Sequence, residues 1–142
     1  MKYGIRAAAL SLCLMTPVAA VLAQTSPANT TLGSVTLNRK VTADGQPLAA
    51  GTYQVRLGTG EPKPAVGQSP EAERYVEFVK GGKVVAREVA TVVSDADVKA
   101  ILKAPKLARG GVRVEMLKGN DYLRVWINRD GNNYIIHLPA TA

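Results

Sequence analysis

Few side chains in this sequence belong to the types that usually perform catalysis. The chain contains one histidine, His137, and one cysteine, Cys13, among 142 residues. A zinc site with several histidine or cysteine ligands is therefore not available. A cysteine nucleophile paired with histidine is not available either, because Cys13 lies in a segment that we expect to be removed as an export signal. A Ser-His-Asp triad would need Ser34, Ser69 or Ser94 as its nucleophile, but no nucleophile-elbow pattern surrounds any of them. We therefore predict no catalytic residue in this chain.

Metal and phosphate sites are not indicated either. Calcium requires clustered oxygen ligands, whereas Asp95 and Asp97 form a sparse pair that suits the start of a helix. The glycine-rich segment at residues 58–60 lacks the spacing of a phosphate-binding loop and precedes no predicted helix. The sequence therefore predicts neither a metal site nor another cofactor.

The last third of the chain offers the best candidate for a ligand-binding surface. Tyr122 and Trp126 fall on one face of a predicted strand, about 13 Å apart by the rise per residue. Two aromatic rings at that separation would present platforms to a glycan or an extended peptide, with charged neighbours as hydrogen-bonding groups. The candidate ligand-binding residues are Tyr122, Arg124, Trp126, Arg113, Glu115 and His137.

The same residues also fit a purely structural role. Trp126 and Ile135 would then pack under a helix or a crossing loop. Glu115, Arg124 and His137 would form a ladder of charges across three strands. The solvent exposure of the Trp126 indole distinguishes the two interpretations.

A basic stretch without any acidic residue precedes this region. Such a stretch could contact lipopolysaccharide, phospholipid headgroups or nucleic acid. Because no aromatic residue is interleaved for base stacking, specific binding of nucleic acid is not predicted. The alternative is a solvated helix face, with a lysine placed favourably near the helix C-terminus. The residues of the basic stretch are Lys99, Lys103, Lys106 and Arg109.

Two tight turns determine how the strands of the candidate surface pair. A Gly-Asn turn and an Asp-Gly turn follow one another along the chain, and both have two residues. The first places Val114 opposite Val125, and the second places Val125 opposite Ile136. Both registers put Leu123, Val125 and Ile127 at the centre of one apolar face, as a three-stranded meander with one buried side requires.

Alternating polar and apolar residues predict further strands upstream. The first strand has Val35, Leu37 and Val41 on its buried side, and a second strand covers residues 52–57. A long exposed loop, rich in glycine and proline, follows at residues 58–70. A Gly-Gly turn then predicts a third, tightly connected pair of strands.

Regular pairing across this Gly-Gly turn places Lys80 opposite Lys83 and Phe78 opposite Val85.

A short helix is predicted after this hairpin, over residues 95–103. Ser94 would cap its start, Val98 and Ile101 would lie on its apolar face, and Pro105 would prevent its continuation.

These elements predict a mainly all-β fold with about seven strands and one short helix. Because nearly all strands are joined by local turns, the expected architecture is an antiparallel β-sandwich or a partly open barrel. Residues 32–139 would form this single domain.

Residues 1–23 have the organisation of an export signal. A positively charged start precedes an apolar run that ends in small residues, which predicts cleavage between Ala23 and Gln24. A retained anchor is the alternative, but Pro17 interrupts a run that is already short for a membrane span. We therefore expect a periplasmic or extracellular protein without a transmembrane segment in its mature chain. Residues 24–31 are small and polar and are expected to form a flexible leader.

The overall composition agrees with a soluble, folded, moderately basic domain. The formal net charge is +7, with 18 basic and 11 acidic residues that alternate through most of the chain, and loss of the signal removes two positive charges. A hydrophobic content of 46% excludes disorder of the whole chain. The mature chain would contain no cysteine, so its core rather than a disulfide would have to stabilise it.

Residues 44–55 read DGQPLAAGTYQV. This segment resembles the G-x-P-L-x-A-G-x-Y-x-V phrase of bacterial transthyretin-like and carboxypeptidase-regulatory-like β-sandwich modules. The whole chain is also similar to small exported proteins of Gram-negative bacteria. These resemblances imply a non-catalytic accessory module with a β-sandwich fold, and they transfer no functional residue to this chain.

The sequence therefore predicts a non-catalytic, exported accessory module of the bacterial cell envelope that binds a protein or a glycan through a β-sheet face. The alternative is a structural or assembly subunit that self-associates through an open sheet edge. The sequence leaves the oligomeric state open.

Overall fold

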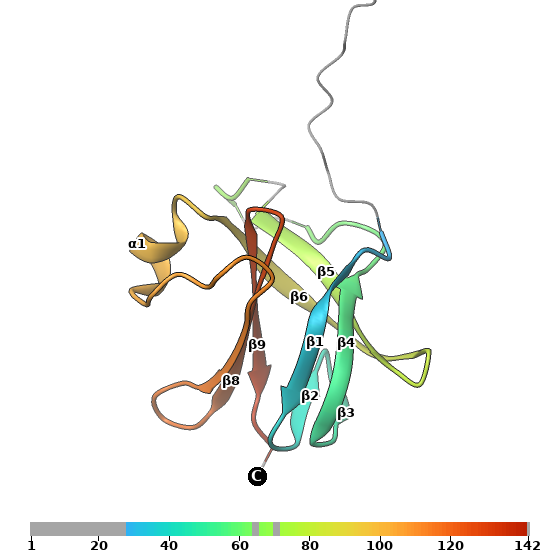
Figure 1. The fold of residues 1–142 in the computed structure, drawn as a ribbon. Coiled ribbons are helices and arrows are strands. Elements are labelled where there is room, and N and C mark those ends of the chain that lie inside the picture. The colour runs from blue at the N-terminus through green and yellow to red at the C-terminus, as the bar shows by residue number, and fades with distance from the viewer. Residues whose placement is uncertain (1–27, 64–65, 70–71, 142) are drawn as a thin grey trace, which may run out of the picture.

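The computed structural model describes residues 28–63, 66–69 and 72–141 of the chain. This part contains nine strands and one short helix (Figure 1). The strands are β1 (Thr31–Leu37), β2 (Val41–Ala43), β3 (Gln46–Leu48), β4 (Gly51–Leu57), β5 (Glu73–Lys80), β6 (Lys83–Ser94), β7 (Val112–Met116), β8 (Tyr122–Arg129) and β9 (Asn132–Pro139), and the helix is α1 (Val98–Leu102).

Seven of these strands form one antiparallel sheet in the order β1-β4-β5-β6-β9-β8-β7. The sheet curls until its two edges approach each other, so that it is nearly closed as a barrel (Figure 1). Gly33 lies where the edges meet, and a Cβ atom there would be 3.2 Å from Cγ2 of Val112 and 3.5 Å from Cγ2 of Ile127. The expected antiparallel, mainly β fold is thus confirmed, and the sheet adopts the barrel-like form.

The barrel interior is filled by side chains at alternate positions of its strands. In β4, for example, Tyr53, Val55 and Leu57 are buried while the residues between them are more exposed. The largest of the fully buried interior side chains is that of Phe78 on β5. Burial of this apolar surface is the main stabilising contribution available to a domain of this kind.

Strands β2 and β3 form a small second sheet whose apolar side chains join the barrel core. The prediction that Val41 continues the first strand was wrong. After Leu37 the chain bends, and Val41 instead pairs with Leu48 of β3. Val41 is still fully buried, which explains why it continues the pattern of alternating polar and apolar residues that begins in β1.

The hairpin of β5 and β6 contains a β-bulge that changes its register. Lys80 lies opposite Lys83, as predicted, but Phe78 lies opposite Ala86 rather than Val85. Regular pairing would have placed Arg87 opposite Val76 in the core. The bulge shifts the register by one residue, so Ala86 is buried and Val85 is 41% exposed.

The predicted registers of the C-terminal meander are confirmed. Val114 pairs with Val125, and Val125 pairs with Ile136. Asn120 and Asp130 both have positive φ, at 61° and 50°, as tight turns between twisted strands require.

Helix α1 begins later and is shorter than predicted. Its N-cap is Asp97, which makes no side-chain capping bond. Ser94 ends β6 instead, where its Oγ donates to Oδ2 of Asp97 over 2.7 Å. Val98 is fully buried, but Ile101 is 58% exposed, so only part of the expected apolar face is used.

Part of the predicted leader belongs to the fold, because Thr31 already lies in β1. The predicted signal and residues 24–27 of the predicted leader lie outside the described residues. The remainder of that leader is not free. The backbone N–H of Asn29 donates to O of Leu57, and N–H of Leu57 donates to O of Thr30, both over 2.8 Å.

Candidate functional site

Trp126 is fully buried in a second apolar cluster outside the barrel. It points away from the barrel core, but α1 and the loop at residues 103–111 cover it, with Val98 and Leu107 in the same cluster. The indole therefore cannot serve as a binding platform, and the proposed pair of exposed rings with Tyr122 is wrong. The structural alternative, with Trp126 and Ile135 packed under a helix and loop, describes what is found.

Arg113 contacts both Trp126 and the loop that covers it. Its guanidinium carbon lies 4.9 Å from the centroid of the Trp126 ring, and its Nη1 donates to O of Pro105 over 3.3 Å. These contacts hold the loop against the strands, so Arg113 is occupied within the fold.

A buried polar network continues from the indole. Nε1 of Trp126 donates to Oδ1 of Asn133 over 2.8 Å, and Nδ2 of Asn133 donates to Oδ1 of Asp95 over 2.8 Å. Nδ2 of Asn128 donates to the same Asp95 oxygen over 2.7 Å. The hydrogen bond from Asn133, with help from Asn128 and Lys106, lowers the pKa of Asp95 below its ordinary value of 3.8, against the opposing effect of desolvation.

Glu115, Arg124 and His137 lie side by side in one row across β7, β8 and β9, as the registers predicted. Nε of Arg124 donates to Oε1 of Glu115 over 2.9 Å, and Nη2 of Arg124 contacts the same oxygen. Partial burial, followed by the charge of Arg124, lowers the pKa of His137 below its ordinary value of 6.5. The row is thus a half-exposed charge ladder, and Tyr122 beside it is 46% exposed.

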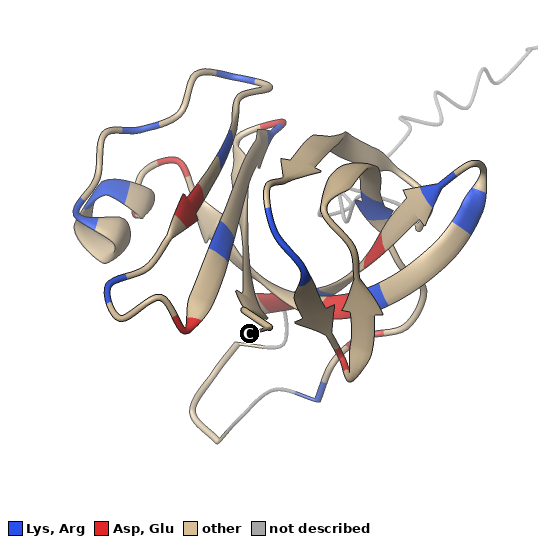
Figure 2. Cartoon of the chain, turned by 90° about the horizontal axis from the view of Figure 1, so that it is seen from below, with Lys and Arg blue, Asp and Glu red and all other residues tan. Residues whose placement is uncertain are grey.

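The predicted basic stretch is exposed but is not free of acidic neighbours. Lys99, Lys103, Lys106 and Arg109 are all solvent-exposed. Nζ of Lys106, however, lies 3.3 Å from Oδ2 of Asp95, which folding brings next to the loop. Figure 2 shows that Lys and Arg are spread over both sides of the barrel rather than gathered at α1.

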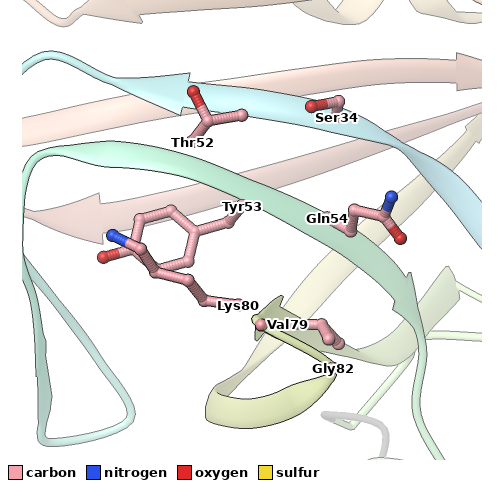
Figure 3. Close-up of a pocket in the computed structure, with 8 residues that line it drawn as sticks. Ser34, Thr52, Tyr53, Gln54, Val79, Lys80 and Gly82 are labelled. Atoms are coloured by element: carbon pink, nitrogen blue, oxygen red, sulfur yellow. The ribbon is translucent and has the colours of Figure 1, made fainter.

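A polar groove lies away from α1, between the start of β4 and the β5–β6 turn (Figure 3). Pairing of β4 with β5 ends at Gln54 and Val79, one residue before β5 itself ends at Lys80. The resulting groove has a volume of about 330 Å³. It is lined by Ser34, Thr52, Tyr53, Gln54, Val79, Lys80, Gly81 and Gly82.

Within this groove, Lys80 lies along the ring of Tyr53 (Figure 3). Its Nζ is 5.1 Å from the ring centroid, and the ring is fixed because the Tyr53 hydroxyl donates to O of Ala49 over 2.7 Å. None of the ion pairs found among the described residues includes Lys80 or its cross-strand partner Lys83. The groove therefore offers hydroxyl and amide groups together with a cation that has no carboxylate partner within the described chain.

The sequence analysis did not identify the groove or the buried asparagines. The predicted register does place Asn128 opposite Asn133, and this pairing is confirmed. It also placed Lys80 opposite Lys83. The pairs Asn128–Asn133 and Lys80–Lys83 were therefore the signals that the sequence offered. Neither pair shows where a groove forms or which loop covers a face of the sheet.

Within residues 28–63, 66–69 and 72–141, no group of three or more His, Cys, Asp or Glu side chains is placed to hold a metal ion. No helix in the same ranges has the length and hydrophobicity needed to cross a membrane.

No protein-family model, curated protein or solved structure matches this chain. The resemblance to transthyretin-like and carboxypeptidase-regulatory-like modules thus stays a prediction.

Proposed function

We propose that this chain is a non-catalytic, exported accessory module of the bacterial cell envelope, and that it binds a glycan in the groove between β4 and the β5–β6 turn. The observation that carries this proposal is the concentration of exposed hydrogen-bonding side chains in that groove. Ser34, Thr52 and Gln54 line the groove and are all exposed, on the outer face of β1 and β4.

The groove favours a glycan because its chemistry is polar and its positions are rigid. Ser34, Thr52 and Gln54 belong to paired strands, and Ser34 lies directly opposite Gln54. Side chains on strands hold their positions better than side chains on loops, which suits a ligand recognised through many hydroxyl groups.

A protein ligand is less favoured because the exposed apolar side chains do not form one clear patch. They belong to distant parts of the chain, and protein interfaces usually centre on aromatic and apolar groups. The exposed large apolar residues are Val66, Val84, Val85, Ile101, Val112 and Tyr122.

The outer face of the C-terminal meander, where we first expected the ligand, serves as the internal control. With Trp126 buried and Arg113 stacked on it, this face retains Tyr122 and the charge ladder of Glu115, Arg124 and His137. Tyr122 is exposed and does not line the groove, so a substitution there tests the two surfaces against each other.

The proposal is tested by pull-down of the exported protein on peptidoglycan sacculi, dextran and polygalacturonate. The double variant Thr52→Ala/Gln54→Ala removes two hydrogen-bonding groups, and we expect its affinity for a bound polymer to fall about tenfold. Tyr122→Ala should bind like the parent protein. Failure of the parent to bind any of the three polymers overturns the proposal, and so does loss of binding in Tyr122→Ala alone.

A second candidate function is self-association through a sheet edge. The observation that favours it is that β9 pairs with β6 only from Ala90 to Ser94, while residues 83–89 of β6 pair with β5 alone in the described chain. Val84 and Val85 on this segment are 45% and 41% exposed. Unpaired strand edges with apolar side chains are templates for pairing with another chain.

Light scattering of the purified protein over a range of concentrations tests this second function. An oligomer that dissociates in Val84→Lys supports it. A strict monomer at the highest soluble concentration overturns it.

A further inference from the structure

Two lysines face each other at the β5–β6 turn without a compensating acid. Lys80 lies directly opposite Lys83, and the turn between them consists of Gly81 and Gly82. Like charges directly opposite each other on paired strands destabilise the pairing. Neither lysine is in an ion pair within the described chain, so no carboxylate there compensates the two charges. An anion bound from solution would relieve it.

The Lys80 ammonium is also held in place. Its Nζ lies 5.1 Å from the centroid of the Tyr53 ring, and a Cβ atom added to Gly51 would be 3.1 Å from the same nitrogen. The ring beneath it is 3% exposed and bonded through its hydroxyl to Ala49. A cation stacked on a fixed aromatic ring loses less freedom on binding than a lysine that extends freely into solvent.

Other side chains that line the groove can contact the hydroxyl groups of a sugar ligand. Ser34, Thr52 and Gln54 line the same groove and provide donors and acceptors, whereas an ammonium provides donors only. A ligand that contacts both these outward-facing groups and the Lys80 ammonium needs hydroxyls together with a negatively charged oxygen.

We propose that the groove recognises an acidic glycan, with Lys80 as the ion-pair partner of an anionic oxygen group, either the carboxylate of a uronic acid or the phosphate of a phosphorylated sugar. Lys83 adds long-range attraction from the other side of the turn. This inference rests on the proposed function, because it names the ligand class of the same groove.

The test compares binding of immobilised polygalacturonate, phosphorylated dextran and neutral dextran. The parent protein should prefer one or both acidic polymers, and the preference should weaken as salt rises. Lys80→Gln should lower the affinity for the preferred acidic polymer about tenfold, the change expected for one charge-assisted hydrogen bond. Lys80→Arg keeps the positive charge and should therefore retain the preference for acidic over neutral polymers.

Lys118→Gln is the matched control, because it removes one exposed lysine beside another tight turn. It should leave the affinity unchanged. Equal affinity of the parent for acidic and neutral dextran overturns the acidic-glycan inference while the proposed function stands. An unchanged affinity in Lys80→Gln, with its thermal unfolding midpoint also unchanged, overturns the inference as well. Binding of no polymer at all overturns both proposals, and the preferred acidic polymer identifies the carboxylate or the phosphate as the group recognised.

Discussion

The indole nitrogen of Trp126 donates a 2.8 Å hydrogen bond to the side-chain oxygen of Asn133, and both side chains are completely buried. A buried indole N–H needs such a partner, because an unsatisfied donor costs about 1–3 kcal/mol. The bond therefore allows a large aromatic residue to sit on the outer side of the barrel, where alternation alone would have exposed it. It links the apolar cluster under α1 with the polar network around Asp95.

We expect Trp126→Ala to lower the free energy of unfolding by about 3–5 kcal/mol, the range for large aromatic residues deleted from a core. Trp126→Phe should cost less, because most of the apolar contact remains while the hydrogen bond to Asn133 is lost. Urea unfolding followed by circular dichroism measures both changes. Tyr122→Ala, at an exposed position of the same strand, should stay within about 0.5 kcal/mol of the parent. A loss below about 1 kcal/mol in Trp126→Ala would contradict the buried position.

Gly33 is expected to limit how closely the edges of the barrel approach. A Cβ atom there would lie 3.2 Å from Cγ2 of Val112, so the branched side chain in Gly33→Val must push β1 away from β7. We expect a loss of about 1–3 kcal/mol, as in other overpacked sites. Thermal and urea unfolding measure it. Thr31→Val, at an exposed position of the same strand, is the control and should change stability little. Equal stabilities of the two variants would show that the edges do not press against each other.

The pKa of His137 should be measurably below 6.5, because partial burial and the charge of Arg124 both disfavour its protonated form. The unfolded chain then binds a proton more readily, so this residue lowers stability as the pH falls through 6.5 towards the folded pKa, and causes no further loss below it. Since the chain has one histidine, its imidazole signals in NMR titrations are unambiguous. Arg124→Gln should raise the pKa part of the way. A pKa above 6.5 in the parent would refute the described environment.

Asp95 should contribute to stability in the opposite pH direction. Hydrogen bonds from Asn133 and Asn128 and the proximity of Lys106 lower its folded pKa below 3.8. Its contribution is therefore present above pH 3.8 and is lost as the pH falls through the folded pKa. Asp95→Asn should flatten the acid limb of the stability profile measured by urea unfolding at several pH values. Lys106→Gln should shift the same limb less. An acid limb identical in Asp95→Asn and the parent would contradict this assignment.

The sequence was most informative where short turns joined amphipathic strands. The Gly-Asn and Asp-Gly turns gave the correct pairing of Val114, Val125 and Ile136, because two-residue turns leave a single register. The bulge in the β5–β6 hairpin escaped prediction because its cause is global. Only the barrel core shows that Ala86 rather than Val85 must lie opposite Phe78.

The candidate site was predictable only in part. Alternation correctly put Trp126 on the outer side of its strand, but it carries no information about what covers that side. The cover comes from α1 and the loop at residues 103–111, which have no strong periodicity. The groove lies where the pairing of β4 with β5 ends, at Gln54 and Val79, which is likewise a property of the folded sheet.

The placement of Trp126 also determines what an optical experiment on this protein will report. It is the only tryptophan in the chain, and it belongs to the cluster beneath α1 rather than to the barrel interior. Its fluorescence will therefore follow detachment of that cover, while backbone circular dichroism follows the sheet. If the cover opens before the barrel unfolds, the two signals will change at different denaturant concentrations, and the difference will measure how strongly the two cores are coupled.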